Sequence, residues 1–151
     1  MKIYLGADHG GFDLKEKIKG WLTEWGYEFE DLGNTVFDPE DDYPDFAFKV
    51  AENVAKNPES RGIMACRSAA GMVIAANKIK RIRAVSAFDV ASAKHSREHN
   101  DTNVLGLSGD WMDEATAQEI LRVFLGTPFS GEKRHQRRIE KIKKYEDMIY
   151  D

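Results

Sequence analysis

The chain has 151 residues, a formal net charge of −4 and one cysteine. A single cysteine excludes an internal disulfide and a cysteine-based zinc site, and it fits a reducing compartment. The acidic balance does not suit a nucleic-acid-binding protein, and no apolar run approaches the roughly 18 residues of a membrane span. No charged segment with a long apolar run behind it precedes the first predicted strand, so we expect no signal peptide and a cytoplasmic protein. The length predicts one domain over residues 1–151.

Apolar runs alternate with helical patterns along the whole chain. In the first half, the predicted elements are a strand over Lys2–Ala7, a helix from Phe12 to a stop at Gly26, a strand over Tyr27–Leu32, an acidic loop over residues 34–43, and a helix from about Tyr43 to Asn57. Pro44 suits the first turn of that second helix. The acidic stretch over residues 28–45 is interpreted as solvated surface.

The same alternation continues in the second half. The predicted elements are a strand over Gly62–Cys66, a helix over Ala69–Ile79, a strand over Arg83–Phe88, a helix capped by Asp89 that runs to about His99, a strand over Val104–Leu107, a helix capped by Asp113 that runs to about Leu125, a turn over residues 127–131, and a charged helix over about 133–149. Asp is a favoured N-cap residue, which supports the two caps. The basic stretch over residues 133–144 is interpreted as solvated surface.

Strands that alternate with helices of this length predict an α/β fold with a parallel sheet and right-handed crossovers. Several strands are apolar on both faces, so we expect three layers, with helices on both faces of five parallel strands. An open parallel sheet binds ligands beyond the carboxyl ends of its strands. That edge is predicted to carry Asp8 and His9, then Cys66, then Asp110.

Cys66 ends the third predicted strand and is followed by small residues and a helical pattern. A thiol at such a turn is either a small buried hydrophobe or a thiolate favoured by converging main-chain N–H groups. Ser68 either donates its hydroxyl to a ligand or caps the helix. Gly10 and Gly11 permit a sharp turn or a close approach to a ligand, and they lack the spacing of a dinucleotide-binding fingerprint.

Two further groups carry candidate chemistry. His99 lies at the end of a predicted helix, where it is either a cationic surface cap or an acid or base near neutral pH. His95 lies four residues earlier, and without a further ligand at suitable spacing we do not predict a metal site. Arg134 and Arg138 share a helix face and either bind a phosphate or form a solvated basic surface.

Together these residues resemble the ribose-5-phosphate isomerase B family, which includes the galactose-6-phosphate isomerase subunits. The matching segments are Gly6-Ala7-Asp8-His9-Gly10-Gly11-Phe12, Asp42-Tyr43-Pro44-Asp45-Phe46-Ala47, Ala75-Ala76-Asn77-Lys78, Ser96-Arg97-Glu98-His99-Asn100-Asp101, Arg134-His135 and Arg138. The resemblance implies a Rossmann-like fold, a homodimer or a dimer of dimers, and active sites between subunits. It also implies that no metal or organic cofactor is needed.

The resemblance also implies a reaction, the interconversion of an aldose phosphate and a ketose phosphate, with the leading pair ribose 5-phosphate and ribulose 5-phosphate. Cys66 would be the base that moves a proton through an enediolate, and His99 would assist opening of the sugar ring. Main-chain N–H groups from residues 67 to 71 would stabilise the enediolate oxygen. The implied catalytic residues are Cys66, His99 and Ser68, and the implied substrate-binding residues are Asp8, His9, Arg67, Gly71, Asn100, Arg134, His135 and Arg138.

The chain departs from the family pattern after the cysteine and after the fifth predicted strand. The usual Gly-Thr-Gly-x-Gly loop is Arg67-Ser68-Ala69-Ala70-Gly71 here, so side chains add strain wherever that loop needs positive φ. Asp110 stands where many members have a phosphate-binding arginine, and Trp111 is a bulkier residue expected to narrow the pocket. One hypothesis pairs Arg67 with Asp110; another gives Arg67 the anchoring of substrate. The alternatives are therefore another sugar phosphate, such as galactose 6-phosphate, or a non-catalytic sugar-phosphate-binding relative.

Overall fold

The computed structural model describes residues 1–150, which form five strands and six helices. The strands are β1 (Lys2–Ala7), β2 (Glu28–Asp31), β3 (Arg61–Cys66), β4 (Ala84–Ser86) and β5 (Val104–Ser108). The helices are α1 (Phe12–Glu24), α2 (Tyr43–Lys56), α3 (Ala70–Ala76), α4 (Val90–Asn100), α5 (Glu114–Gly126) and α6 (Lys133–Ile149). No helix within residues 1–150 is both long enough and apolar enough to cross a membrane.

The five strands form one parallel sheet, as predicted, and their order across it is β2-β1-β3-β5-β4. The chain leaves β1 for the edge strand β2 and then crosses to β3 on the opposite side of β1. The direction of the winding therefore reverses between β1 and β3. Such a reversal opens a crevice at the carboxyl ends of the two strands, where sheets of this kind bind ligands.

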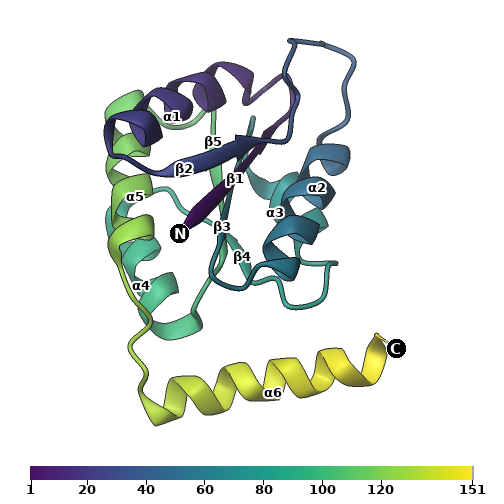
Figure 1. Cartoon of the computed structure of the whole chain (residues 1–151), viewed down its shortest axis with the longest axis vertical. Coiled ribbons are helices and arrows are strands. Elements are labelled where there is room, and N and C mark those ends of the chain that lie inside the picture. The colour runs from purple at the N-terminus through teal and green to yellow at the C-terminus, as the bar shows by residue number, and fades with distance from the viewer. Residues whose placement is uncertain (151) are drawn as a thin grey trace.

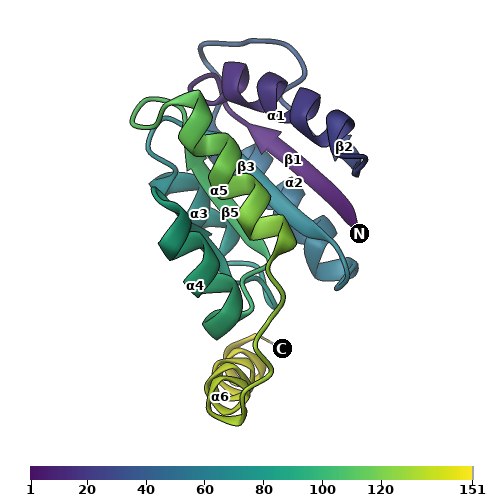
Figure 2. The same cartoon turned by 90° about the vertical axis from the view of Figure 1, so that its left-hand side faces the viewer.

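Helices cover both faces of the sheet, which confirms the predicted three-layer Rossmann-like α/β fold. Helices α1, α4 and α5 pack on one face, and α2 and α3 pack on the other (Figures 1 and 2). Successive strand residues point to opposite faces, so Ile3 and Leu5 join the first layer while Tyr4 joins the second. By the same alternation Cys66 faces the layer of α2 and α3.

Three predicted elements are shorter in the structure. One is the strand predicted over Tyr27–Leu32, which is β2 (Glu28–Asp31). The helix predicted over Ala69–Ile79 is α3, which ends at Ala76, and the strand predicted over Arg83–Phe88 is β4, which spans Ala84–Ser86. The side chain of Asn77 bonds the main-chain N–H and C=O of Ala84 at 2.8 and 2.9 Å and so ties the end of α3 to the start of β4. Tertiary contacts of this kind carry no periodic signal in a sequence.

The two predicted aspartate caps are confirmed. Asp89 Oδ1 accepts a hydrogen bond from Ser92 N at 2.6 Å at the start of α4. Asp113 Oδ1 accepts one from Thr116 N at 2.7 Å at the start of α5. Each cap satisfies one of the N–H groups that the first turn of a helix leaves without an intrahelical partner.

The acidic stretch over residues 28–45 is only partly the solvated surface that the sequence predicted. The Asp31 carboxylate forms an ion pair with the buried Lys15 side chain, with 2.6 Å between Oδ2 and Nζ. Lys15 Nζ also donates to the Asn34 carbonyl at 2.6 Å, which fixes the turn after β2. Burial of Asp31 favours its neutral form, yet the bonds from Lys15, the Gly33 N–H and Lys19 outweigh burial and hold the Asp31 pKa below its ordinary value. A buried charge of this kind needs its partner, so Lys15 and Asp31 are a structural pair.

Candidate active site

The loops that follow β3 and β5 are hydrogen-bonded together at the carboxyl edge of the sheet. Gly109 N donates to the Cys66 carbonyl at 2.8 Å, and Asp110 N donates to the Arg67 carbonyl at 3.2 Å. Ser108 Oγ also donates to the Arg67 carbonyl, at 2.5 Å. Residues from the two strand ends are therefore held as one rim beside the reversal between β1 and β3.

Cys66 lies at this rim and is buried, with 4% of its surface exposed. Burial raises the pKa of the Cys66 thiol, and the negative charge of Asp8 adds to that rise. The main-chain N–H groups of Met72, Ala69 and Ser68 act in the opposite direction and do not outweigh burial. The expectation that the strand-to-helix turn makes this thiol acidic is therefore wrong for the protein alone, because desolvation outweighs the N–H groups.

The loop after Cys66 adopts positive φ at one of the two positions, 67 and 69, where the resemblance leads us to expect glycine. Ala69, the residue before α3, has φ 68°, whereas Arg67 is not among the residues with positive φ. Strain therefore falls on Ala69, and the side chain at position 67 is tolerated by the backbone. Ser68 Oγ accepts a long contact from Ala70 N at 3.4 Å, which fits a weak cap. Gly71 lies against the ring of Tyr43, which a Cβ would meet at 2.6 Å.

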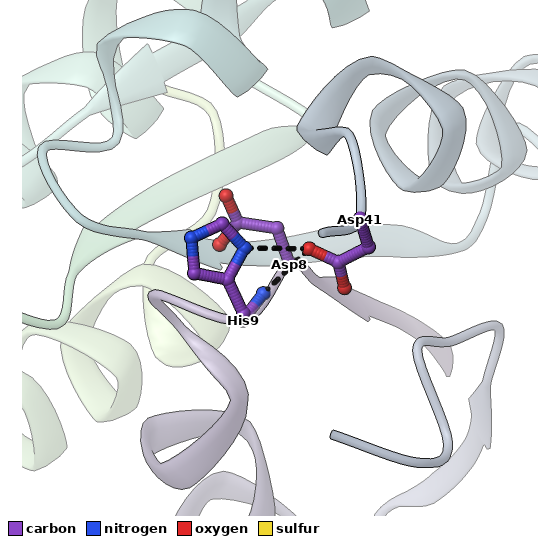
Figure 3. Close-up of side chains that lie close together, drawn as sticks. All are labelled: Asp8, His9 and Asp41. Carbon is purple, nitrogen blue, oxygen red and sulfur yellow. Dashed lines mark hydrogen bonds and ion pairs between the residues drawn. The ribbon is translucent and has the colours of Figure 1, made fainter. Parts of the chain in front are cut away.

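Asp8, His9 and Asp41 form a cluster at the end of β1 (Figure 3). Asp8 is buried and its Oδ1 accepts a hydrogen bond from Gly11 N at 3.1 Å, so it makes the turn that leads into α1. Burial raises the pKa of the Asp8 carboxyl, although the nearby His9 opposes this. His9 donates its main-chain N–H to Asp41 Oδ1 at 3.0 Å, and the Nδ1 of its ring lies 2.7 Å from the same oxygen.

Asp41 is a member of the site that the sequence analysis missed. It lies in the acidic segment interpreted as solvated surface, and no motif or periodicity marks it. The Asp8, His9 and Asp41 ligand atoms lie within 4.8 Å of one another, a spacing that could hold a cation. The 2.7 Å contact between Nδ1 and Oδ1 is a hydrogen bond, and it accounts for the cluster without an ion.

Arg67 and Asp110 approach one another across the rim, with 3.8 Å between Nε and Oδ2. Both side chains are exposed, so this contact is a weak ion pair. The two residues line a cavity of about 400 Å³ together with His9 and Gly10. Trp111 does not line that cavity and is 71% exposed, so the expectation that it narrows the pocket finds no support.

A second cluster consists of three stacked imidazole rings. The His99 ring lies between those of His95 and His135, with centroid distances of 3.9 and 4.1 Å. His135 is buried and its Nδ1 lies 2.8 Å from Ser130 Oγ. Desolvation lowers the pKa of His99, and repulsion from His95, His135 and Arg134 lowers it further. These effects outweigh the helix end, which favours the cation, so the pKa of His99 lies below its ordinary value.

Arg97 fixes the end of α4 that carries this stack. It is buried, and its guanidinium donates to Asp101 Oδ1 at 2.8 Å and to the carbonyls of Thr102 and Thr127 at 2.5 and 3.0 Å. Thr127 begins the segment that leads to α6, so these bonds join α4 to the segment before α6. They place His99 beside His135 although the two are far apart in the sequence.

The two clusters lie at opposite edges of the sheet. Arg83 directly precedes β4 and donates to the Asp101 carbonyl at 2.8 Å, so the end of α4 lies at the amino edge. Cys66 lies at the carboxyl edge, at the end of β3 (Arg61–Cys66). A strand such as β3 spans about 16 Å from one edge of the sheet to the other. Figure 2 shows α6 beyond the amino edge, far from the loops that follow β1 and β3. Within one chain, the predicted site residues therefore fall into two separate groups. The group at the carboxyl edge is Asp8, His9, Cys66, Arg67, Ser68 and Gly71, and the group at the amino edge is His99, Asn100, Arg134, His135 and Arg138.

The fold and the comparison with known proteins together define a class of protein, the α/β sugar-phosphate isomerases. Residues 3–142 match the model of the Ribose/Galactose Isomerase family. Ribose-5-phosphate isomerase B of Mycobacterium tuberculosis is 40% identical over 146 residues, which cover 97% of this chain and 90% of that protein.

Two solved structures are also similar. Ribose-5-phosphate isomerase B of Clostridium thermocellum superimposes with a TM-score of 0.94 at 41% identity, covering 99% of both chains. The Mycoplasma genitalium enzyme, whose structure holds bound ribulose-5-phosphate, superimposes with a TM-score of 0.93 at 40% identity, covering 97% of this chain and 96% of that one. The chain belongs to the Ribose/Galactose Isomerase family.

Proposed function

We propose that this chain interconverts ribose 5-phosphate and ribulose 5-phosphate, with Cys66 as the base. The observation that carries the proposal is the position of Cys66 at the carboxyl end of β3, beside Asp8 and the reversal between β1 and β3. Similar proteins bear the name ribose-5-phosphate isomerase B, and one was solved with bound ribulose-5-phosphate. No step of this reaction needs a metal or organic cofactor.

In the proposed reaction, the Cys66 thiolate removes the proton from C2 of the open-chain aldose. The C–H electron pair forms a C1=C2 double bond, and negative charge moves onto O1. The thiol then returns the proton to C1, while the proton of the O2 hydroxyl passes to O1. The product is the ketose, with no net change in protons. Main-chain N–H groups from residues 67 to 71 stabilise the charged oxygen, and the Ser68 hydroxyl supports them.

We further propose that a second copy of the chain completes each site, because one chain holds its two clusters at opposite edges. His99 of the second copy would accept a proton during ring opening, as its lowered pKa favours. Asn100, Arg134, His135 and Arg138 would hold the sugar and its phosphate from the same side. Two arginines four residues apart suit a phosphate dianion. The proposed assembly is a homodimer, with a dimer of dimers as the larger alternative.

A second candidate is the same chemistry on another sugar phosphate, such as galactose 6-phosphate. The observation that favours it is the contact between Arg67 and Asp110. In the family pattern glycine stands in place of Arg67 and arginine in place of Asp110, and here both side chains line the cavity beside His9. A carboxylate at position 110 repels a phosphate there. A non-catalytic sugar-phosphate-binding relative is the remaining alternative.

The deciding experiment is an assay of the purified protein against pentose and hexose phosphates, with Cys66→Ala and Arg67→Gly variants. We expect turnover of ribose 5-phosphate, incorporation of solvent deuterium at C1 of ribulose 5-phosphate when the reaction starts from the ketose, and a loss of about 100-fold or more in Cys66→Ala. Turnover of a different sugar phosphate alone would favour the second candidate. Binding without turnover on any substrate would favour the non-catalytic relative.

Three broader predictions belong to the same proposal. We take residues 1–151 as one isomerase domain. The single cysteine, kept as a free thiol, fits a cytoplasmic location. The net charge of −4 suits a small-molecule enzyme without nucleic-acid or membrane partners.

A further inference from the structure

We propose that Asp41 is a positioning residue for substrate binding: its carboxylate orients the His9 imidazole and keeps both ring nitrogens protonated, so that Nε2 donates to an oxygen of the sugar phosphate. The inference rests on the proposed role of His9 in holding the substrate. The inference adds Asp41, from a loop far from His9 in the sequence, as the residue that orients His9 in that role.

The geometry gives Asp41 two bonds to one residue. Its Oδ1 accepts the His9 main-chain N–H at 3.0 Å and lies 2.7 Å from Nδ1 of the same residue. The first bond fixes the backbone at the end of β1, and the second fixes the rotation of the ring. Figure 3 shows the other ring nitrogen on the side of the imidazole that faces away from Asp41. His9 also lines the cavity of about 400 Å³ beside Arg67.

Asp41 is itself held in place. Its side chain is 5% exposed, although the segment around it is largely exposed. Asn34 Nδ2 donates to its second oxygen, Oδ2, at 3.2 Å. The Asn34 carbonyl in turn accepts the 2.6 Å bond from buried Lys15. A chain of contacts therefore runs from the interior through Asn34 to Asp41 and ends at His9.

The charges that face His9 favour its protonated form. The hydrogen bond to Asp41 raises the pKa of His9, and the charges of Asp8 and Asp41 add to it against desolvation and the charge of Arg67. A protonated imidazole has two donors, and one of them is used by Asp41. The remaining donor suits a phosphate or hydroxyl oxygen of the substrate. Below the raised pKa of His9 this donor is present, and it is lost as the pH rises through that value.

The test compares Asp41→Asn with the wild-type protein. The asparagine keeps an acceptor for the ring and the main chain but removes the charge. We expect the His9 pKa, followed by NMR of the ring and assigned with His9→Gln, to fall in Asp41→Asn. We also expect the KM for ribose 5-phosphate to rise about tenfold near neutral pH with little change in kcat. Asp41→Ala, which also frees the ring, should raise KM further.

A matched control is Glu40→Gln, which removes one negative charge from an exposed neighbour in the same segment. It should leave the His9 pKa and KM unchanged. An unchanged His9 pKa in Asp41→Asn, or a KM rise equal to that of Glu40→Gln, would overturn the inference. A protein that turns over no sugar phosphate, yet whose His9 pKa falls in Asp41→Asn, would sink the proposed function and keep the pairing of Asp41 with His9.

Discussion

The side chain of Arg67 packs over Gly10, so closely that a Cβ at Gly10 would lie 2.4 Å from Arg67 Cγ. The two residues come from different loops at the same edge of the sheet. The absence of a side chain at position 10 is therefore what admits one at position 67. The Arg67 side chain is accommodated by this contact.

Gly10→Ala should force Arg67 out of its present conformation and break its contact with Asp110. We expect a loss of about 1 kcal/mol in the free energy of unfolding, measured by urea denaturation, because overpacking displaces a rotamer. In an Arg67→Gly background the same substitution should cost less. Equal costs in both backgrounds would show that the two positions are independent.

Ala69→Gly should stabilise the fold. Ala69 has φ 68°, a left-handed conformation that costs an L-residue about 1 kcal/mol and a glycine almost nothing. Thermal unfolding should therefore show a higher midpoint for Ala69→Gly. The control is Ala70→Gly at the first residue of α3, where glycine should lower the midpoint. A lower midpoint for Ala69→Gly would place the strain elsewhere.

The pH dependence of activity should reflect a thiol whose pKa is raised by burial. The thiolate is the base in the proposed reaction, so kcat/KM should rise with pH through the Cys66 pKa and stay below its maximum at neutral pH. Because Cys66 is the only cysteine, the rate of alkylation by iodoacetamide reports the same group. An alkylation rate already at its plateau at neutral pH would contradict a raised pKa.

Mixing two inactive variants should restore activity if each site uses two copies of the chain. Cys66→Ala lacks the proposed base and His99→Asn lacks the proposed ring-opening residue, so each alone should be nearly inactive. Unfolded and refolded together in equal amounts, they should recover about a quarter of the wild-type activity, since half of the dimers are mixed and each of those has one intact site. No recovery would place both groups in one chain's site.

Much of the fold follows from local patterns. The alternation of apolar runs and helical segments predicts the parallel sheet, and Asp89 and Asp113 mark their helices because an N-cap is a local interaction. The predicted end of α3 was wrong because the Asn77 side chain bonds the main chain of Ala84, a contact set by the tertiary fold.

The site was predictable only where motifs mark it. Strand ends place Asp8, His9 and Cys66 together, as the parallel sheet requires. Asp41 belongs to the same cluster but sits in an acidic segment where nothing distinguishes it from its neighbours. The directions of the Cys66 and His99 pKa shifts were also missed, because they depend on burial and on the stacking of rings from α4 and α6. Local sequence does not carry that information.

The opposite placement of the thiol and the histidine stack has a consequence for the protein in dilute solution. Under the proposed two-copy site, the number of working sites follows mass action, because each needs two chains. Dilution below the dissociation constant of the dimer would leave folded chains that hold Cys66 without a histidine stack beside it. Specific activity would then fall with dilution while each chain stays intact, so protein concentration itself would act as a control on turnover.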